Sequence, residues 1–456
     1  MALIDPAPSV TAPNPEPAPE PAPPGLGRRF LTVWTGQTIS TIGSAVSGVG
    51  IAVYVFITTG SLAWLGLLTA VETLPVLLTG PFLRLTDRYD RRTVMIRADI
   101  AAAIGPAIAL AIALFGELQP WHLAVAGFAG GLGTSFQVPA YQAALPHLVD
   151  GDAIERANGL VQLGPAAALV LGPAIATPIV AWWGIEAILV VDLSTFLIGA
   201  AVTGFTKFSA IGTQEAGDDG SNRAAFTWLK GPGRPLLVLL AVMACVNLVL
   251  AFFSLALFAL AVDLGGAARA GLAPAVGGIA MIAAGIAMAK RGLPDRRTGA
   301  LAFAIVMMAA GAVIAAIRPS FWLLLVGAAV ALASVPIGSA SVATMFHEHV
   351  PDSMHGRVFG LRGVLGQVLY PLGSVTAGLV GARLAAPAMS EGGALSSSIG
   401  RIIGVGPERG PAVMLIAVAV ALMLLMIPLT RNRDVRSLDR ARADQPEPVT
   451  TPNLGV

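Results

Sequence analysis

Residues 66–93, GLLTAVETLPVLLTGPFLRLTDRYDRRT, form a hydrophobic segment that runs directly into a dense basic turn. Residues 271–298, GLAPAVGGIAMIAAGIAMAKRGLPDRRT, repeat this plan 205 positions later. Both stretches begin with Gly-Leu and end with Asp-Arg-Arg-Thr, and they align with each other without a gap. Internal repeats on this scale are typical of membrane proteins built from two related halves. We therefore predict a duplicated membrane protein.

The composition agrees with a membrane environment. Of the 456 residues, 55% are hydrophobic and only 12% are charged, whereas soluble domains carry about 25% charged residues. Most of the chain must therefore face lipid or other apolar helices. The net charge of +2 and the clustered charges do not describe a nucleic-acid-binding surface. The single cysteine, Cys245, lies in an apolar run, which excludes a disulfide framework or a cysteine metal site.

Apolar runs of about 20 residues, the length that crosses a bilayer as a helix, recur along the chain. Twelve such runs occur, at 31–57, 62–83, 98–116, 122–141, 158–181, 186–205, 235–262, 271–289, 300–317, 322–343, 358–380 and 411–430. A polar segment at 206–234, expected to be a cytoplasmic linker, separates six from six. We expect an all-α fold of 12 transmembrane helices, in two pseudo-symmetric six-helix bundles at 30–205 and 235–430.

The placement of lysine and arginine predicts the orientation, because cytoplasmic loops of membrane proteins carry an excess of both. With the N-terminus inside, 23 of the 28 Lys and Arg residues fall in cytoplasmic segments and 5 fall outside. We therefore expect a multi-pass protein of the cell membrane with both termini in the cytoplasm. The Pro-rich segment 1–29 and the charged segment 431–456 are expected to be disordered cytoplasmic tails.

Residues 83–92, LRLTDRYDRR, resemble the signature G-x-x-x-D-R-x-G-R-R, which joins the second and third helices in the major facilitator superfamily. The acid and the three arginines of the signature match at Asp87, Arg88, Arg91 and Arg92. Leu83 and Asp90 stand where glycines are usual. Asp90 in that place is familiar from the drug:proton antiporter branch, which includes macrolide exporters and the enterobactin exporter.

Further short patterns resemble that branch. They are Trp34-x-Gly36-Gln37-x-x-Ser40, Pro139 with Leu145-Pro146, Ala157-Asn158, Gly172-Pro173, Asp192 with Phe196, and Pro351 with Gly356-Arg357-Val358. The resemblance covers about 30–430. We expect a monomer that binds a small-molecule substrate, protons and membrane lipids, and that uses no nucleic acid, cofactor or metal.

Five charged residues are candidates for a latch between the halves: Asp87, Arg88, Arg91, Arg92 and Arg357. The resemblance implies that Asp87 meets the cytoplasmic start of the eleventh helix when the inside is closed. A carboxylate at a helix N-terminus gains roughly 0.3–1 kcal/mol. The alternative is a basic loop that only sets the topology, in which Asp87 offsets charge.

Glu72 lies in the middle of the second apolar run. A charge at this depth costs about 2.5–3.5 kcal/mol on insertion scales, so Glu72 must face a cavity, have a partner or be protonated. Thr69 and Thr73 fall on the same helical face. The side chain is either a proton-carrying or cation-binding carboxylate in a central cavity, or a protonated acid in a helix–helix hydrogen bond.

Two further acids are candidates for proton coupling. Asp192, near the outer end of the sixth helix, is expected to transfer protons or to act as a structural cap. Asp99 is expected in the first turn of the third helix, where an acid suits the helix dipole, although it could also pair with Arg97.

Other polar side chains within the apolar runs are candidates for substrate contact, and the small ones also for helix packing. These candidates are Gln37, Ser40, Ser44, Thr69, Thr73, Gln137, Tyr141, Gln162, Asn247, Gln367 and Tyr370. Gly172 and Pro173 resemble the antiporter signature of the fifth helix and predict close helix packing. The segment His347-Glu348-His349 lacks cysteines or a second acid cluster nearby, so no metal site is expected.

These features predict a secondary active exporter of small organic molecules, such as drugs, antibiotics or siderophores, that works by proton antiport and alternating access. An enzyme is not expected, because the sequence has no nucleophile–base pair and no phosphate-binding loop. Within the same fold, the alternatives are a lipid or lysolipid translocator and an importer. Outside it, the alternative is a membrane scaffold or receptor that transports nothing.

Overall fold

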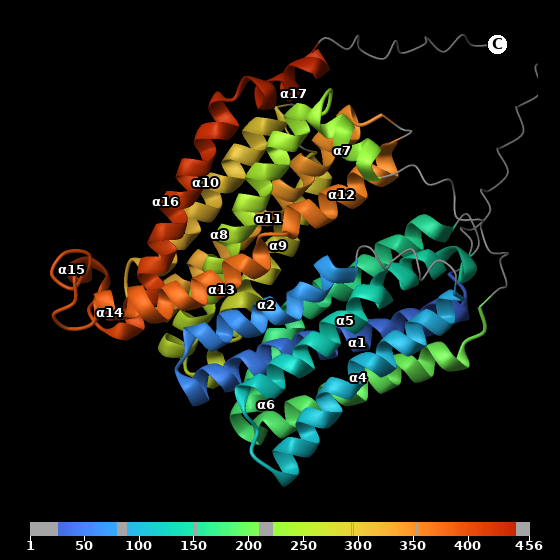
Figure 1. The fold of residues 1–456 in the computed structure, drawn as a ribbon, viewed down its shortest axis with the longest axis horizontal. Helices are drawn as coiled ribbons and strands as arrows, with labels where there is room; N and C mark the ends of the chain where they lie inside the picture. Colours follow the sequence, from blue (N-terminus) through green and yellow to red (C-terminus); the bar gives the residue numbers. More distant parts are fainter. Residues whose placement is uncertain are drawn as a thin grey trace, which may run out of the picture.

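The computed structural model describes residues 26–79, 89–149, 153–208, 222–292, 294, 296–351 and 354–443. Within these ranges every regular element is a helix (Figure 1), which confirms the predicted all-α class. Asp87 and Arg88, two of the latch candidates, lie outside the described residues, as does the tail up to residue 25.

The N-terminal half is a bundle of long helices. It contains α1 (Arg28–Thr59), α2 (Leu62–Thr79), α4 (Arg91–Phe115), α5 (Pro120–Ala144), the short 3₁₀ turn η2 (Leu145–His147) and α6 (Ile154–Phe205). The element α6 joins two helices across Gly184, whose φ of 78° lies in the left-handed region that glycine adopts readily. The two parts of α6 correspond to the fifth and sixth predicted runs.

The C-terminal half repeats this plan. It contains α8 (Arg234–Gly265), η4 (Ala267–Arg269), α9 (Leu272–Arg291), α10 (Arg297–Ala316), α11 (Phe321–His349), α12 (His355–Gln367), α13 (Tyr370–Val380) and α16 (Gly410–Arg431). The eleventh predicted run is therefore broken into α12 and α13.

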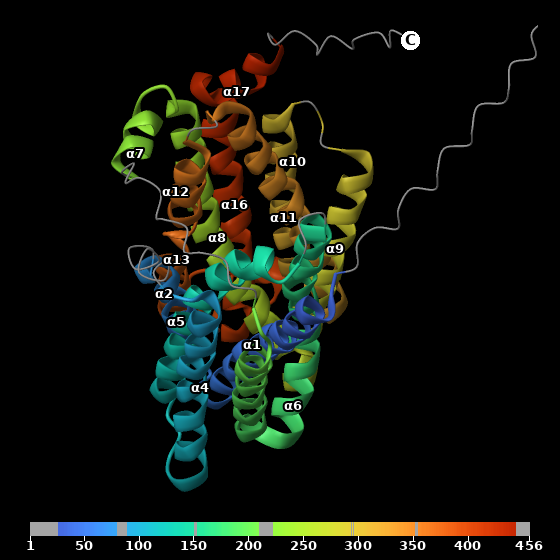
Figure 2. The same ribbon diagram turned by 90° about the vertical axis from the view of Figure 1, so that its right-hand side faces the viewer.

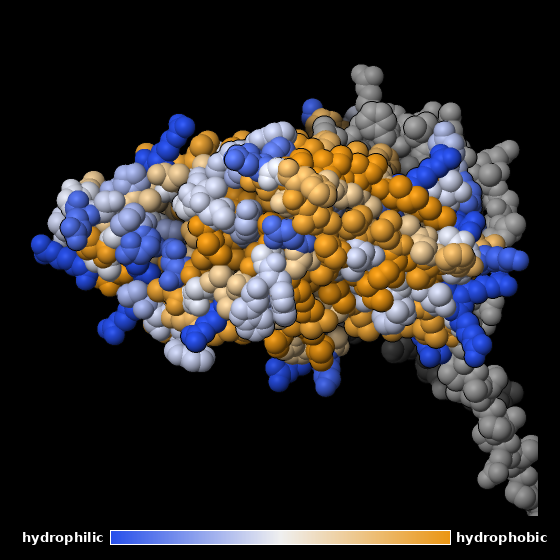
Figure 3. Space-filling model, turned by 90° about the horizontal axis from the view of Figure 1, so that it is seen from below, coloured by the Kyte–Doolittle hydropathy of each residue, from blue (hydrophilic) through white to orange (hydrophobic). Residues whose placement is uncertain are grey.

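Most of these helices are long and hydrophobic enough to span a membrane. Nine helices of the described ranges are long and apolar enough to cross a bilayer, and one of the nine covers both parts of α6. The shorter α2 and the more polar α5 cover the second and fourth predicted runs. On the face shown in Figure 3, hydrophobic side chains dominate the middle and hydrophilic ones gather toward the two ends. This distribution fits a protein surrounded by lipid.

The two bundles meet at one end, through two pairs of helices. Helix α2 packs on α13, and α6 packs on α9 and η4. Figure 1 shows the bundles in contact near α2 and α13 and diverging toward α7, α12 and α17, and Figure 2 shows the same halves from the side. Helix α12, at the diverging end, packs on α7 and α8 of its own half. The described helices of the two halves therefore pack against each other at one end and diverge toward the other.

Helices also occur in three segments outside the twelve predicted runs. The predicted linker includes α7 (Asn222–Lys230), and the predicted disordered tail includes α17 (Arg433–Ala443). The expectation for 433–443 was wrong because Val435 and Leu438, three residues apart on one face, are buried against the C-terminal half. The segment between α13 and α16 contains η6 (Gly381–Ala385), α14 (Ala386–Met389), α15 (Gly400–Ile403) and η7 (Pro407–Arg409).

Arg409 holds this last segment against the end of α10. Its guanidinium is 3% exposed and donates hydrogen bonds to the carbonyls of Ala316 (2.8 Å) and Ile403 (2.6 Å). A cation near a helix C-terminus interacts favourably with the free carbonyls there. The segment is therefore fixed by a buried cation.

Candidate functional site

A cavity of about 260 Å³ lies inside the N-terminal half, between α1, α2, α5 and the second part of α6. Its walls combine hydroxyl-bearing and small residues with two acids, Glu72 and Asp192. Thr69, Thr73 and Val76 of α2 line it together with Glu72, so the polar face expected from their spacing exists and points inward. The acids therefore share one cavity rather than separate helix contacts.

Glycines on the neighbouring helices make room for Glu72. A Cβ at Gly48 of α1 would lie 3.4 Å from the Glu72 Oε1 atom, and a Cβ at Gly131 of α5 would collide with the Glu72 backbone carbonyl. The Glu72 side chain is exposed, and the surface that it exposes belongs to the cavity. It forms no hydrogen bond or ion pair with any described residue, which contradicts the interpretation as an acid in a helix–helix hydrogen bond.

Asp192 lies on the opposite wall and is 7% exposed. Its Oδ1 atom is buried without a hydrogen-bond partner, and the Ser47 hydroxyl is a hydrogen-bonding neighbour of the carboxylate. Glu72 is near enough to Asp192 to repel it electrostatically. The residue stands eight positions after the kink at Gly184, in the body of the helix, so the structural-cap interpretation is wrong.

A second cavity of about 160 Å³ adjoins the first, because Ser44 and Thr134 line both. Its walls carry amides, hydroxyls and two aromatic rings but no charged group. They include Trp34, Gln37, Ser40, Ser44, Gln137, Tyr141, Gln142 and Gln162. The Tyr141 hydroxyl is buried without a hydrogen-bond partner. Six of the predicted substrate-contact residues therefore surround one space in the N-terminal half.

Asp99 is the centre of a buried hydrogen-bond network. It is 1% exposed, and its carboxylate accepts from the amide Nε2 atoms of Gln137 (2.7 Å) and Gln37 (3.4 Å). The Gln137 side-chain amide also donates to the side-chain oxygen Oε1 of Gln37, and the Gln37 side-chain amide donates to the Thr203 hydroxyl (3.2 Å). The predicted place of Asp99 in the first turn of its helix was wrong, because α4 begins at Arg91.

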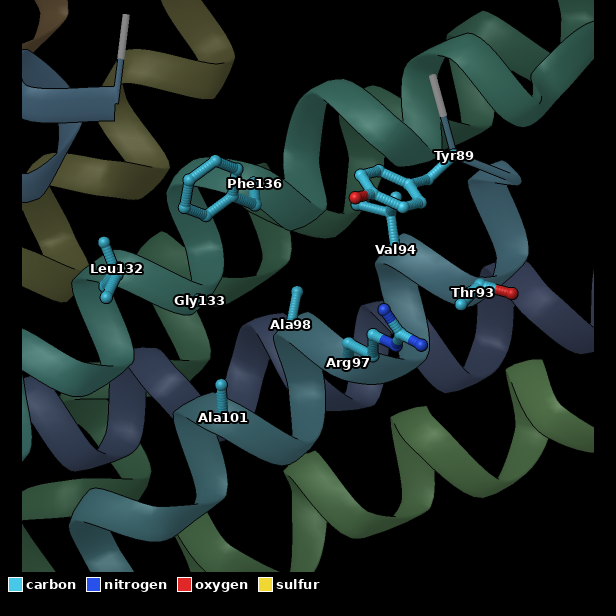
Figure 4. Close-up of a pocket in the computed structure, with 9 residues that line it drawn as sticks. All are labelled: Tyr89, Thr93, Val94, Arg97, Ala98, Ala101, Leu132, Gly133 and Phe136. Carbon is cyan, nitrogen blue, oxygen red and sulfur yellow. The ribbon is translucent and has the colours of Figure 1, made fainter. Parts of the chain in front are cut away.

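Arg97 does not pair with Asp99. Figure 4 shows the Arg97 side chain beside a groove between α4 and α5, which Tyr89 and Phe136 also line. Asp99 follows Arg97 by two residues in α4, and a helix turns by about 200° over two residues. The two side chains therefore leave the helix on nearly opposite sides, and Asp99 points into the bundle. The pairing considered from the sequence therefore fails on helix geometry.

Two of the latch candidates, Arg92 and Arg357, lie in described helices of different halves. The Arg92 guanidinium donates to the backbone carbonyls of Thr203 (3.2 Å) and Gly204, at the C-terminal end of α6 in its own half. In this conformation Arg92 therefore caps a helix of its own half, and its predicted role between the halves when the inside is closed stays a prediction. Arg357 lies in the first turn of α12, which packs on α7 and α8.

The candidates in the C-terminal half surround the break between α12 and α13. Pro371 has no backbone N–H to continue the helix, and the Asn247 amide donates to the free carbonyl of Gly366 (3.0 Å). Gln367 ends α12 with an exposed side chain. The Tyr370 hydroxyl is hydrogen-bonded to Ser254 and interacts electrostatically with Glu72 across the boundary between the halves.

Gly172 and Pro173 occupy a contact between three helices. A Cβ at Gly172 would lie 2.6 Å from the Cβ of Ala45 in α1, and the carbonyl of Pro173 faces Gly271 of the other half. This arrangement agrees with the close packing expected of them. The contributions of Ser47, Thr134 and Thr203 were not among the predicted site residues, because a hydroxyl in a membrane helix often bonds only its own backbone.

Comparison with known proteins places these features in a family. The model of the Major Facilitator Superfamily matches residues 33–374. The chain is 26% identical over 369 residues to Macrolide efflux protein A of Streptococcus pyogenes, covering 78% of this chain and 90% of that protein. It is 25% identical over 313 residues to the protein of the same name from Enterococcus faecalis, covering 66% and 95%.

Solved structures share the fold. The nucleoside transporter NupG, in a mutant form, matches with a TM-score of 0.68 at 12% identity, over 89% of this chain and 100% of that one. A bacterial homologue of the human lysosomal transporter Spinster, in an inward-facing and unoccupied conformation, matches with a TM-score of 0.66 at 16% identity, over 90% and 97%. The protein is a secondary transporter by descent and fold, and the chain belongs to the Major Facilitator Superfamily.

Proposed function

We propose that this protein exports small organic molecules of the macrolide kind from the cell, in exchange for protons. The observation that carries the proposal is that Glu72 and Asp192 line the same cavity. Among the described residues, the Asp192 Oδ1 atom has no hydrogen-bond partner, and no Lys or Arg lines the cavity. The names of two relatives that match most of the chain, both macrolide efflux proteins, support the choice of cargo.

Two acids in one cavity favour the binding of positive charge. Ionising both carboxylates at once is costly at membrane depth, because they repel each other and because Asp192 is largely removed from solvent. Either protons or a cationic group of the cargo relieves this cost. Cargo and protons therefore compete for the same acids, which is the requirement for exchange.

The adjoining uncharged cavity supplies the other part of the binding site. Its amides and hydroxyls, from Gln37, Gln137, Gln142 and Gln162 among others, suit hydroxyl and carbonyl groups of a large amphiphile. A molecule with a protonated amine and an oxygen-rich body matches both cavities. Macrolides that carry an amino sugar have this combination.

Export also requires that the cavity open alternately to the two sides. The bundles are in contact near α2, α13 and η4, and they diverge toward α7, α12 and α17. The predicted orientation places the basic, diverging end in the cytoplasm, so this conformation would accept cargo from inside. Protons returning inward supply about 1.4 kcal/mol per pH unit and about 2.3 kcal/mol per 100 mV.

The test is uptake of radiolabelled erythromycin by proteoliposomes with an acidic lumen. Efflux of lumenal protons should drive protein-dependent uptake well above that of protein-free liposomes, which report passive trapping of the amine. Glu72→Gln and Asp192→Asn should each abolish the protein-dependent part. Glu117→Gln, at an exposed acid in the α4–α5 turn, is the matched control and should leave uptake unchanged.

The outcomes separate the alternatives. Uptake that ignores the pH gradient would exclude proton exchange. A protein that moves labelled lysolipid but not erythromycin would be a lipid translocator. An absence of flux for either probe, with both acids tolerant of substitution, would indicate a membrane protein that does not transport.

A further inference from the structure

A groove of about 530 Å³ lies on the outside of the N-terminal half, between the start of α1 and the end of α6. Three cations line it: Arg28, Arg29 and Lys207. No acid is among the described residues that line it, and the first turn of α1 contains no acid. The groove shares no lining residue with the cavity that contains the acids, and it takes no part in the proposed transport.

The three cations are not used elsewhere in the described parts of the chain. None of them forms an ion pair or a side-chain hydrogen bond with a described residue. The free carbonyls at the end of α6, which would attract Lys207, already have donors. Arg92 bonds those of Thr203 and Gly204, and the Thr206 hydroxyl bonds that of Val202 (2.8 Å). Among the described residues, the positive charge of the groove therefore has no counterpart.

The wall of the groove below the cations is apolar. Val202 and Phe205 of α6 line it, and the Phe205 side chain is 90% exposed. Leu197 and Ile198, about two turns before Phe205 in the same helix, are 50% and 42% exposed. A row of exposed apolar side chains on a membrane helix faces hydrocarbon, because such side chains are stable there without protein partners.

We propose that this groove binds an anionic phospholipid of the surrounding leaflet, with its phosphate among Arg28, Arg29 and Lys207 and an acyl chain along Phe205 and α6. A basic pocket between helix ends at the membrane surface is suited to an anionic head group. The apolar wall selects a lipid over a soluble phosphate, which would leave Phe205 uncovered. The bound lipid would join the first and last helices of the N-terminal half, and so stabilise that half.

The test measures lipid binding to the purified full-length protein. Native mass spectrometry and thermal unfolding in a neutral detergent are recorded with dioleoylphosphatidylglycerol, with dioleoylphosphatidylcholine, and with glycerol phosphate as the soluble head group. We expect tighter binding and a higher melting temperature with phosphatidylglycerol than with phosphatidylcholine. Glycerol phosphate alone should neither stabilise the protein nor displace the lipid.

Variants assign the effect to the groove. The triple variant Arg28→Gln, Arg29→Gln, Lys207→Gln should bind phosphatidylglycerol on the order of 100-fold more weakly, since each cation near an anionic lipid contributes about 1 kcal/mol. A matched triple variant, Lys290→Gln, Arg291→Gln, Arg431→Gln, removes equal charge from exposed ends of α9 and α16 and should bind normally.

Two milder variants keep the proposal testable if the triple variant fails to insert. Lys207→Gln alone and Phe205→Ser, which changes no charge, should each weaken phosphatidylglycerol binding. Equal binding of the two lipids, retention of binding in these variants, or full displacement by glycerol phosphate would each overturn the proposal. None of these readouts depends on transport, so the result is independent of the exporter proposal.

Discussion

Gly66 of α2 and Gly271, the residue before α9, lie 205 positions apart, and each faces a backbone carbonyl of the opposite half. A Cβ at Gly66 would collide with the carbonyl of Ser374 in α13, and a Cβ at Gly271 would collide with that of Pro173 in α6. The two glycines are the equivalent first residues of the sequence repeat. Each copy of the repeated glycine therefore makes a close contact across the boundary between the halves, in a pseudo-twofold arrangement.

Substituting the first of these glycines should separate the halves at this contact. We expect Gly66→Ala to lower the melting temperature of the purified protein, because the added methyl displaces backbone rather than a flexible side chain. The matched control is Gly159→Ala in α6, where a Cβ would meet nothing within 4 Å. That change should be neutral or stabilise by about 0.5–1 kcal/mol through helix propensity. Equal melting temperatures for the two variants would contradict the contact.

Asp192 should oppose stability while serving transport. Asp192→Asn removes a carboxylate whose Oδ1 atom is buried and unpaired, so we expect a gain of about 1–3 kcal/mol in the free energy of unfolding. The same variant should lose proton-driven uptake. Thermal unfolding and proteoliposome flux on one preparation measure both quantities. A destabilised variant would show that Asp192 has a structural partner after all.

The Asp99 network should behave as a unit. Gln137→Ala leaves the Asp99 carboxylate with only the longer of its two amide hydrogen bonds, the one from Gln37. Asp99→Asn replaces an acceptor by an amide N–H that faces another donor. Each variant should lower the free energy of unfolding by about 1–3 kcal/mol. The double variant should cost less than the sum, with a coupling of about 0.5–3 kcal/mol. Gln142→Ala, in the same cavity wall and exposed, is the control and should have little effect. Additive losses would mean that the contact carries no energy.

Asp439 should stabilise the start of α10 from the C-terminal helix. Asp439 accepts from the Thr298 backbone N–H (3.2 Å) and hydroxyl, whereas in the first half Asp90 makes the equivalent bonds to Thr93 within its own turn (both 3.0 Å). We expect Asp439→Ala to lower the free energy of unfolding by about 1 kcal/mol, the usual loss when an N-cap side chain is removed.

The control for this prediction is Asp434→Ala in the same helix. Asp434 forms a surface ion pair with Arg234 (3.3 Å), and such pairs contribute about 0–1 kcal/mol. Chemical unfolding of the two variants in detergent compares them directly. A larger loss for Asp434 than for Asp439 would show that α17 does not cap α10.

The sequence predicted the parts of the fold that depend on local composition. Twelve apolar runs, the duplication and the all-α class follow from hydrophobicity and spacing alone, and α17 had a detectable signal in the three-residue spacing of Val435 and Leu438. The inward polar face of Thr69, Glu72 and Thr73 also followed from helical periodicity. These properties are set within one or two turns of a helix, so no distant residue is needed to establish them.

Tertiary structure alone decided which polar side chains meet. Gln37, Asp99 and Gln137 come from three helices, 38 to 100 positions apart, and the sequence gives no indication that their side chains share hydrogen bonds. Arg92 likewise caps α6, 111 positions away, in this conformation. Hydrophobicity places a helix in the membrane, but its rotation and its neighbours depend on how whole helix surfaces pack, and that information is distributed over the entire chain.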